Sequence, residues 1–136
     1  MSGERDLDRL LRSMKPEMQD GVFVFCTLPA GREIPQNLKP VHIFHEREGT
    51  AFVVRREEAE AAGSPYQFAS RLITLTVHSS LEAVGFLAAI TAPLAEAGIS
   101  VNAVSAFYHD HLFVPVQLAE EAMRILQRLA RDVRGR

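Results

Sequence analysis

The chain has 136 residues, of which 47% are hydrophobic and 24% charged, and its formal net charge is −2. These values are typical of a globular domain and exclude wholesale disorder, and a charge near zero gives no reason to expect nucleic acid or a membrane surface as a partner. The single cysteine, Cys26, excludes an intrachain disulfide and a cysteine-rich zinc site. The start of the chain is polar and no long apolar window occurs, so we expect neither a signal peptide nor a transmembrane helix, and a cytoplasmic location.

The first predicted elements are a helix and a strand. Apolar residues at positions i, i+3, i+4 and i+7 between residues 7 and 14 predict a short helix, which Pro16 ends. Residues 22–28 are almost wholly apolar and rich in β-branched and aromatic types, which favours a central strand. The connection over residues 29–40 holds three prolines and cannot form a regular helix.

A hairpin and a short helix are predicted next. Residues 41–45 and 51–54 are strand-like and flank a polar segment in which Gly49 is expected to supply the permissive turn conformation. Residues 57–62 predict a short helix, because acidic residues stand in its first turn and Gly63 follows its end.

The second half of the chain begins with the clearest strand, residues 72–77, in which apolar residues alternate with threonine. Ser79-x-x-Glu82 predicts a capping box for the next helix, which Pro93 should kink and Gly98 should end in a left-handed conformation. A second hairpin is predicted around Asp110, and the apolar stripe of residues 118–133 predicts a closing helix.

A weak internal repeat links the two halves. Glu57-Glu58-Ala59 matches Glu120-Glu121-Ala122, and Val41 and Phe44 match Val104 and Phe107, all at an offset of 63 residues. Residues 22–28 resemble residues 73–79 at an offset of 51, and the difference of 12 is about the length of one extra helix. The units therefore read β–loop–ββα and βα–ββα.

This order of elements predicts an α+β fold: a ferredoxin-like antiparallel sheet with helices mainly on one face. The second unit has no strand after its last helix, whereas the first unit needs one after residue 62. We therefore expect the strand at residues 72–77 to be shared by both units, or fourth strands to be swapped between units or chains. The expected domains are residues 1–68, with the N-terminal helix, and residues 69–136.

Three stretches of the second half, residues 84–90, 94–101 and 105–115, resemble the ACT domain, and most closely the small tandem-ACT proteins related to amino-acid-sensing regulators. The resemblance is strong over the C-terminal half and faint over the first unit. It implies a regulatory module that binds an amino acid or related metabolite, needs no cofactor, has no catalytic activity and assembles into a homodimer or higher homo-oligomer.

In ACT domains the ligand sits where the first strand, its following helix and the next strand of a paired domain meet. The amide end of that helix, residues 80–85 here, can hold a carboxylate, Asp110 can accept the ammonium and Asn102 can bind main-chain atoms of the ligand. Gly85, Asp110 and Asn102 also have purely structural explanations, as a packing glycine, a turn residue and a strand start. The candidate ligand-binding residues are Ser80, Val84, Gly85, Asn102, Ser105, Asp110 and His111.

Other chemistry has little support in the sequence. His109 and His111 are two residues apart, but no third ligand is placed with them, so no metal site is expected. Cys26 lies in an apolar strand, where burial raises a thiol pKa, so it is expected to be an inert core residue. No set of acid, base and nucleophile converges, so we do not expect an enzyme. The alternative function is a homo-oligomeric protein-interaction module without a small ligand.

Overall fold

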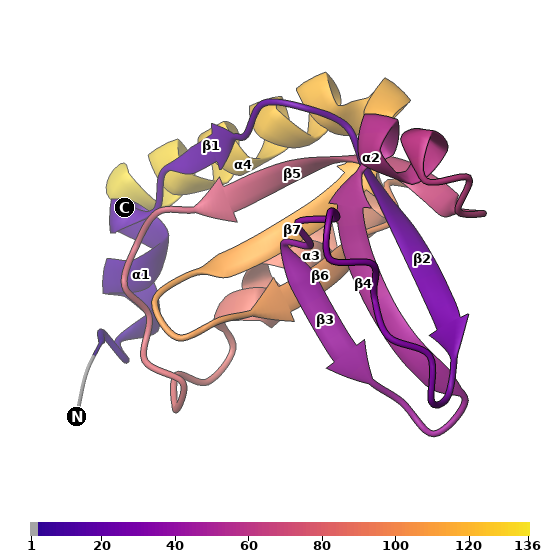
Figure 1. Ribbon diagram of the computed structural model, residues 1–136. Helices are drawn as coiled ribbons and strands as arrows, with labels where there is room; N and C mark the ends of the chain where they lie inside the picture. Colours follow the sequence, from indigo (N-terminus) through magenta and orange to yellow (C-terminus); the bar gives the residue numbers. More distant parts are fainter. Residues whose placement is uncertain (1–2) are drawn as a thin grey trace. The chain divides into compact units, whose positions relative to one another are not determined.

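The computed structural model describes residues 3–136, which divide into two compact units (Figure 1). The large unit combines the chain through Asp20 with Arg71–Arg136, and the small unit is Gly21–Ser70. The helix at the start of the chain thus packs with the C-terminal half, whereas the expected division at residue 68 grouped it with the first half. No helix among the described residues is long and apolar enough to cross a membrane.

The large unit contains a ferredoxin-like sheet with the strand order β1-β5-β7-β6. Its fourth-strand position is filled by β1, which pairs antiparallel with the end of β5. The sequence predicted no strand at β1, where Pro16 was expected only to end the helix. The elements of this unit are α1 Leu7–Ser13, β1 Pro16–Met18, β5 Gln67–Leu75 (continuing from the small unit), α3 Phe86–Glu96, β6 Asn102–Ser105, β7 Asp110–Pro115, the 3-10 helix η1 Val116–Leu118 and α4 Ala119–Arg134.

The small unit repeats this order as β5-β2-β4-β3. The first residues of β5 supply its fourth strand, since Ser70 and Gln67 pair with Phe23 and Phe25 of β2. A single strand therefore serves both units, which confirms the expectation of a shared strand, although β5 begins five residues before the predicted start. The elements are β2 Phe23–Pro29, β3 His42–His45, β4 Gly49–Arg55 and α2 Arg56–Ala61.

Each unit has its own apolar core on the helix-covered face of its strands. In the large unit, alternate residues of β5 and β7, such as Ile73 and Leu112, pack against α1, α3 and α4, and Leu10, Ile90 and Leu126 of these helices are fully buried. Because side chains alternate across a strand and recur every three to four residues on a helix, these patterns select the buried faces. The small unit buries Val24, Phe52, Val54 and Ala59.

Three local expectations were wrong. Ser79 does not cap α3, because the N-cap is Gly85 and the Ser79 hydroxyl is bonded elsewhere. Gly49 does not supply a positive φ; it begins β4, where a Cβ would collide with the carbonyl oxygen of Leu28. Asp110 is not a turn residue, since it is the first residue of β7 and pairs with Ser105.

Candidate functional site

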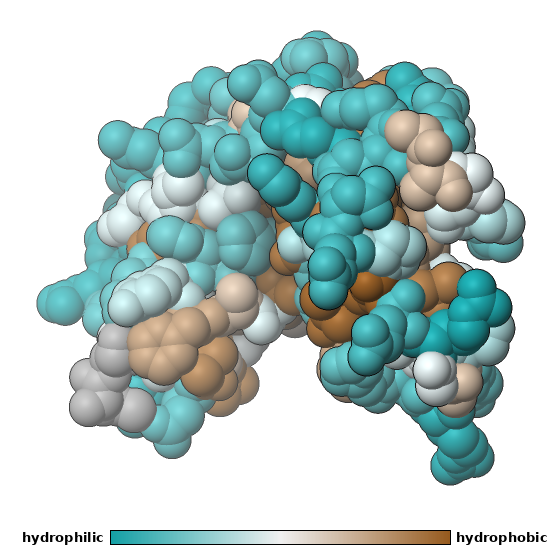
Figure 2. All heavy atoms as spheres, viewed as in Figure 1, coloured by the Kyte–Doolittle hydropathy of each residue, from teal (hydrophilic) through white to brown (hydrophobic). Residues whose placement is uncertain are grey.

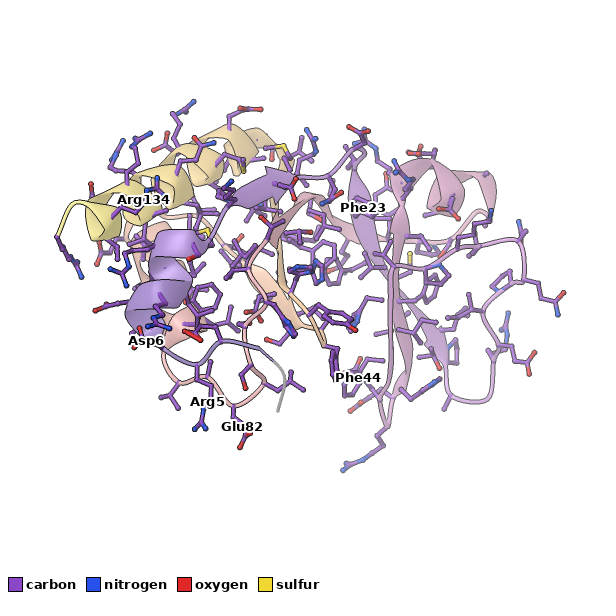
Figure 3. All side chains as sticks on the ribbon, turned by 90° about the vertical axis from the view of Figure 1, so that its left-hand side faces the viewer. Arg5, Asp6, Phe23, Phe44, Glu82 and Arg134 are labelled. Atoms are coloured by element: carbon purple, nitrogen blue, oxygen red, sulfur yellow. The ribbon has the colours of Figure 1, made fainter. Side chains whose placement is uncertain are left out.

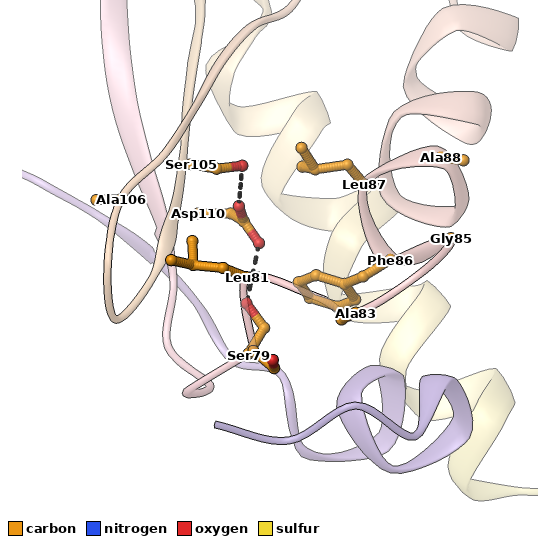
Figure 4. A pocket seen from close by; sticks show the side chains of 11 residues that line it. Ser79, Leu81, Ala83, Gly85, Phe86, Leu87, Ala88, Ser105, Ala106 and Asp110 are labelled. Carbon is orange, nitrogen blue, oxygen red and sulfur yellow. Dashed lines mark hydrogen bonds between the residues drawn. The ribbon is translucent and has the colours of Figure 1, made fainter. Parts of the chain in front are cut away.

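A pocket of about 180 Å³ lies in the large unit, between the start of α3, the loop that precedes it and the hairpin of β6 and β7 (Figure 4). Its lining combines three serines and one carboxylate with small and apolar side chains. The lining residues are Ser79, Ser80, Leu81, Ala83, Gly85, Phe86, Leu87, Ala88, Ser105, Ala106 and Asp110.

The carboxylate of Asp110 is the only ionisable side chain in this lining, and the residue is 6% exposed. The hydroxyl of Ser105 donates a hydrogen bond to its Oδ1 at 2.5 Å, and the hydroxyl of Ser79 donates one to its Oδ2 at 3.3 Å (Figure 4). Within residues 3–136 no cationic side chain forms a salt bridge with it. A carboxylate can accept about four hydrogen bonds, so with two hydroxyl donors it has capacity for a charge-assisted bond to a cationic group.

The N-terminus of α3 forms the opposite wall of the pocket. Gly85 adopts φ +89° at the N-cap, a left-handed conformation that suits glycine, and no side chain caps the helix. The N–H groups of Phe86, Leu87 and Ala88 have no hydrogen-bond partner in the described part of the chain. Free amides and the positive end of the helix dipole together favour an anionic group at this wall.

The loop before α3 is a hydrogen-bonded turn. The Ser80 hydroxyl accepts a hydrogen bond from the Glu82 amide at 3.1 Å, and the Ser80 carbonyl accepts one from the Ala83 amide at 3.0 Å. Ser79 and Ser80 are both buried, whereas Leu81 is 66% exposed at the rim. These bonds fix the backbone that presents Ser79 to Asp110.

Exposed aromatic side chains follow Ala106, a lining residue, in the turn between β6 and β7. Phe107 and Tyr108 project from the hairpin turn and pack against one another and against the ring of His78. Figure 2 shows the apolar side chains of this region gathered at the lower left of the view.

The structure brings four of the seven predicted residues together around the pocket: Ser80, Gly85, Ser105 and Asp110. Val84, Asn102 and His111 do not line it. Val84 is 83% exposed, and Asn102 is exposed at the start of β6.

His111 follows Asp110 on β7, so its side chain lies on the other face of the sheet. There its Nδ1 shares a hydrogen bond of 3.0 Å with the hydroxyl of Thr74. Burial lowers the pKa of His111, the nearby His109 lowers it further, and Asp110 partly offsets both.

Several residues that line the pocket were not predicted from the sequence. Ser79 was assigned to a capping box, and no motif in the sequence indicates that its hydroxyl donates to Asp110 instead. Leu81, Ala83 and Ala106 carry no motif, because apolar residues in loops look alike until the fold places them around a cavity.

Other candidate chemistry found no support in the described residues. Within residues 3–136 no group of three or more histidine, cysteine or acidic side chains is arranged to hold a metal ion. Cys26 is free and buried, and burial raises the pKa of its thiol.

Comparison with solved structures shows the same fold in other proteins. A Vibrio cholerae protein of unknown function, described as a possible transport protein, is 44% identical, with a TM-score of 0.83 over 91% of this chain and 95% of that one. An Agrobacterium tumefaciens protein is 19% identical, with a TM-score of 0.75 over 86% and 89% of the two chains.

The ligand-free regulatory subunit of aspartate kinase from Thermus thermophilus is 11% identical, with a TM-score of 0.66 over 88% of this chain and 97% of that one. A search of curated proteins found no match. Family models described as ACT domain match residues 2–71 and, separately, residues 67–128. The two matches are in tandem and together span most of the sequence, and this chain therefore belongs to the ACT-domain family.

Proposed function

We propose that the chain is a regulatory module, without catalytic activity, that binds a free α-amino acid in the pocket of the large unit. ACT domains are typically regulatory, and several proteins of similar fold are regulatory subunits or domains of aspartate kinases. The observation that carries the proposal is the pairing of opposite polarities across one small pocket: the buried Asp110 carboxylate at one wall and free helix amides at the other.

A zwitterion complements this arrangement. Its ammonium would give Asp110 the cationic partner that it lacks, and its carboxylate would accept hydrogen bonds from the first turn of α3. Both interactions form out of bulk water, where charge-assisted hydrogen bonds are stronger than at a surface. The pocket therefore favours ligands that carry both charges over simple amines or simple acids.

The rest of the lining indicates which side chains would fit. Leu81, Leu87 and the alanines offer apolar contacts, and no cationic side chain lines the pocket to neutralise a second acid. A volume of about 180 Å³ is modest. We therefore expect small amino acids with uncharged side chains to bind best, and aspartate and glutamate to bind poorly.

The test is isothermal calorimetry and thermal unfolding with glycine, L-alanine, L-serine, L-threonine, L-valine, L-leucine, L-aspartate and L-glutamate. A ligand at 100 times its Kd stabilises the folded state by about 2.7 kcal/mol, which gives a visible rise in Tm. Asp110→Asn should weaken binding by about 30-fold or more, because loss of one partner of a buried charge pair costs about 2 kcal/mol or more.

Asp132→Asn is the matched control, since Asp132 is exposed on α4 and the chemical change is the same. It should bind like the wild type. If no amino acid in the panel produces heat or a shift in Tm, the proposal is wrong, and equal affinities in the two variants would remove Asp110 from the site.

The alternative function, a homo-oligomeric interaction module, is favoured by a different observation. In the small unit β3 is an edge strand, and Val41, Ile43 and Phe44 are between 45% and 60% exposed. An apolar edge strand is a template for pairing with another chain. A stable dimer in light scattering, together with no response to any amino acid, would favour this alternative.

Assembly and location complete the proposal. ACT domains commonly oligomerise, and we propose a homodimer or a higher homo-oligomer that relays occupancy of the pocket. The one cysteine is free and buried, so the fold has no need of an oxidising compartment, which fits a cytoplasmic setting.

A further inference from the structure

Residues close to the start of the chain lie against the loop that supplies Ser79 and Ser80 to the pocket. Glu4 and Ser79 form a parallel β-bridge. The Glu4 amide donates to the carbonyl of His78 at 2.8 Å, and the Ser80 amide donates to the carbonyl of Glu4 at 2.8 Å. Ser79, whose hydroxyl donates to Asp110, therefore lies between the two residues, His78 and Ser80, that are hydrogen-bonded to the backbone of Glu4.

Gly3 makes this close approach possible. It adopts φ +94°, and a Cβ built there would lie 2.6 Å from the Ser80 nitrogen and 2.8 Å from the Ser79 carbonyl carbon. Both are backbone atoms, which cannot rotate away as a flexible side chain would. A side chain at position 3 must therefore push the segment away from the loop, in addition to straining its own backbone.

The segment is anchored by the helix that comes after it. Asp6 caps α1 by accepting a hydrogen bond from the Arg9 amide at 3.0 Å, and Leu10 and Leu11 are buried in the core shared with α3 and α4. Leu7 also lies 3.7 Å from the position that a Cβ on Gly85 would occupy. The same stretch thus reaches the pocket loop at Ser79 and Ser80 and the start of α3 at Gly85.

Figure 3 shows this stretch from another side, with Arg5, Asp6 and Glu82 of the pocket loop labelled. The contacts with the loop are made by the backbone of Glu4, while its side chain forms only an exposed ion pair with Arg9 at 3.7 Å. Docking of this segment on the pocket loop therefore depends on the backbone of Gly3 and Glu4, and the side chain of Glu4 contributes little.

We propose that residues 3–5, named here the strap, are a positioning segment for the pocket: the strap holds Ser79 on Asp110, so that amino-acid binding and docking of the strap are coupled. This inference rests on the proposed function. Coupling between two sites is reciprocal. The factor by which release of the strap weakens amino-acid binding therefore equals the factor by which a bound amino acid favours the docked strap.

The experiment compares Gly3→Ala with Gly31→Ala. Gly31 has a nearly identical φ of +88°, but nothing lies within 4 Å of its Cβ position, so this control reproduces the backbone strain without a clash. Calorimetry uses glycine, L-alanine, L-serine, L-threonine, L-valine and L-leucine, and hydrogen exchange by NMR follows the Ser80 amide.

We expect Gly3→Ala to weaken binding of the amino acid that the wild type takes up by about tenfold, within the usual range for coupled sites. The Ser80 amide should exchange faster in this variant, and in the wild type that amino acid should slow its exchange. Gly31→Ala should change neither quantity. Glu4→Pro, which removes the donor to His78, should act like Gly3→Ala, whereas Glu4→Ala should resemble the wild type.

Three results would contradict the coupling between the strap and the pocket. Wild-type affinity in both Gly3→Ala and Glu4→Pro, or Ser80 exchange that is indifferent to the amino acid, overturns the strap while leaving the proposed function intact. Failure of every amino acid in the panel to bind the wild type overturns the proposed function and the coupling together. Equal losses in Gly3→Ala and Gly31→Ala would attribute the effect to backbone strain and reject the strap.

Discussion

The large and small units have the same strand order but differ in the segment that leaves their first strand. In the large unit β5 leads through a loop into α3, whose unsatisfied amides form one wall of the pocket. In the small unit β2 leads into residues 30–41, which form neither helix nor strand. The large unit therefore has the unpaired amides of a helix N-terminus beside its pocket, and the small unit has no helix at the equivalent place.

The hairpins of the two units differ in the same way at the other wall. His45 pairs with Thr50 at the end of one hairpin, and Ser105 pairs with Asp110 at the end of the other. Each pair is joined by a side-chain hydrogen bond across the strands. Only the large unit places a carboxylate there and buries it, whereas the matching bond in the small unit is exposed.

The structural equivalence also corrects the sequence repeat. Ser105 lies 60 positions after His45, whereas the helices α2 and α4 begin 63 positions apart. The difference is the three-residue helix η1, which separates β7 from α4 and has no counterpart between β4 and α2. The expected match of Phe44 with Phe107 was therefore wrong, since Phe44 lies within β3 and Phe107 in a turn.

The largest difference between the two hairpins is expected when one hydroxyl is removed from each. Ser105→Ala deprives the buried Asp110 carboxylate of its shorter hydrogen bond, and we expect a loss of about 1.5–3 kcal/mol in the free energy of unfolding, the usual range for hydrogen bonds to charged groups. Thr50→Val removes an exposed hydrogen bond and should change stability by no more than about 0.5 kcal/mol. Urea denaturation measures both, and equal losses would show that the two hairpins do not differ.

A second comparison uses Gly85 of the large unit and Gly63 of the small unit, which have φ values of +89° and +67° and no atom that a Cβ would collide with. Because an L-residue is strained in this region, alanine should cost about 1–2 kcal/mol at each site. Only Gly85→Ala should also lower affinity for an amino acid in calorimetry, since it alters the start of α3. A matching loss of affinity in Gly63→Ala would contradict the assignment of the pocket to the large unit.

The smallest effect concerns pH. Burial, and secondly His109, lower the pKa of His111 in the folded protein below the value of 6.5 that applies when it is unfolded. The unfolded chain then binds more protons, so the stabilisation is complete above that pH and is lost as the pH falls through the folded pKa. His111→Gln should therefore flatten the fall of Tm between neutral and mildly acidic pH, and superimposable profiles would contradict this.

Much of the fold could be predicted because its signals are local. The alternation of apolar residues and threonine marked β5, the helical stripe marked α4, and Gly98 ends α3 with φ +76° as expected. The spacing of apolar residues indicates both the type of element and the face that it buries. Each segment carries this information in its own sequence.

The site could be predicted only in part, for a physical reason. The resemblance to ACT domains indicated Gly85 and Asp110, which both line the pocket. The capping-box motif wrongly predicted that Ser79 caps α3. Asn102 and His111 are near Asp110 in sequence, yet alternation along the strands sends His111 to the other face. Whether a polar side chain enters a pocket depends on strand register and on where a helix begins, and neither is settled by local composition.

Periodicity and composition were sufficient for the α+β class and for excluding an intrachain disulfide or a cysteine-rich zinc site, and they reduced the fourth strand to two alternatives, a shared or a swapped strand. Three features depend on tertiary packing: β1 fills the fourth-strand position, Gly3 lies against the backbone of Ser80, and Ser79 donates to Asp110. These contacts join residues that are 31 to 77 positions apart. They arise from tertiary packing, because loop closure allows many such pairings and the core selects one.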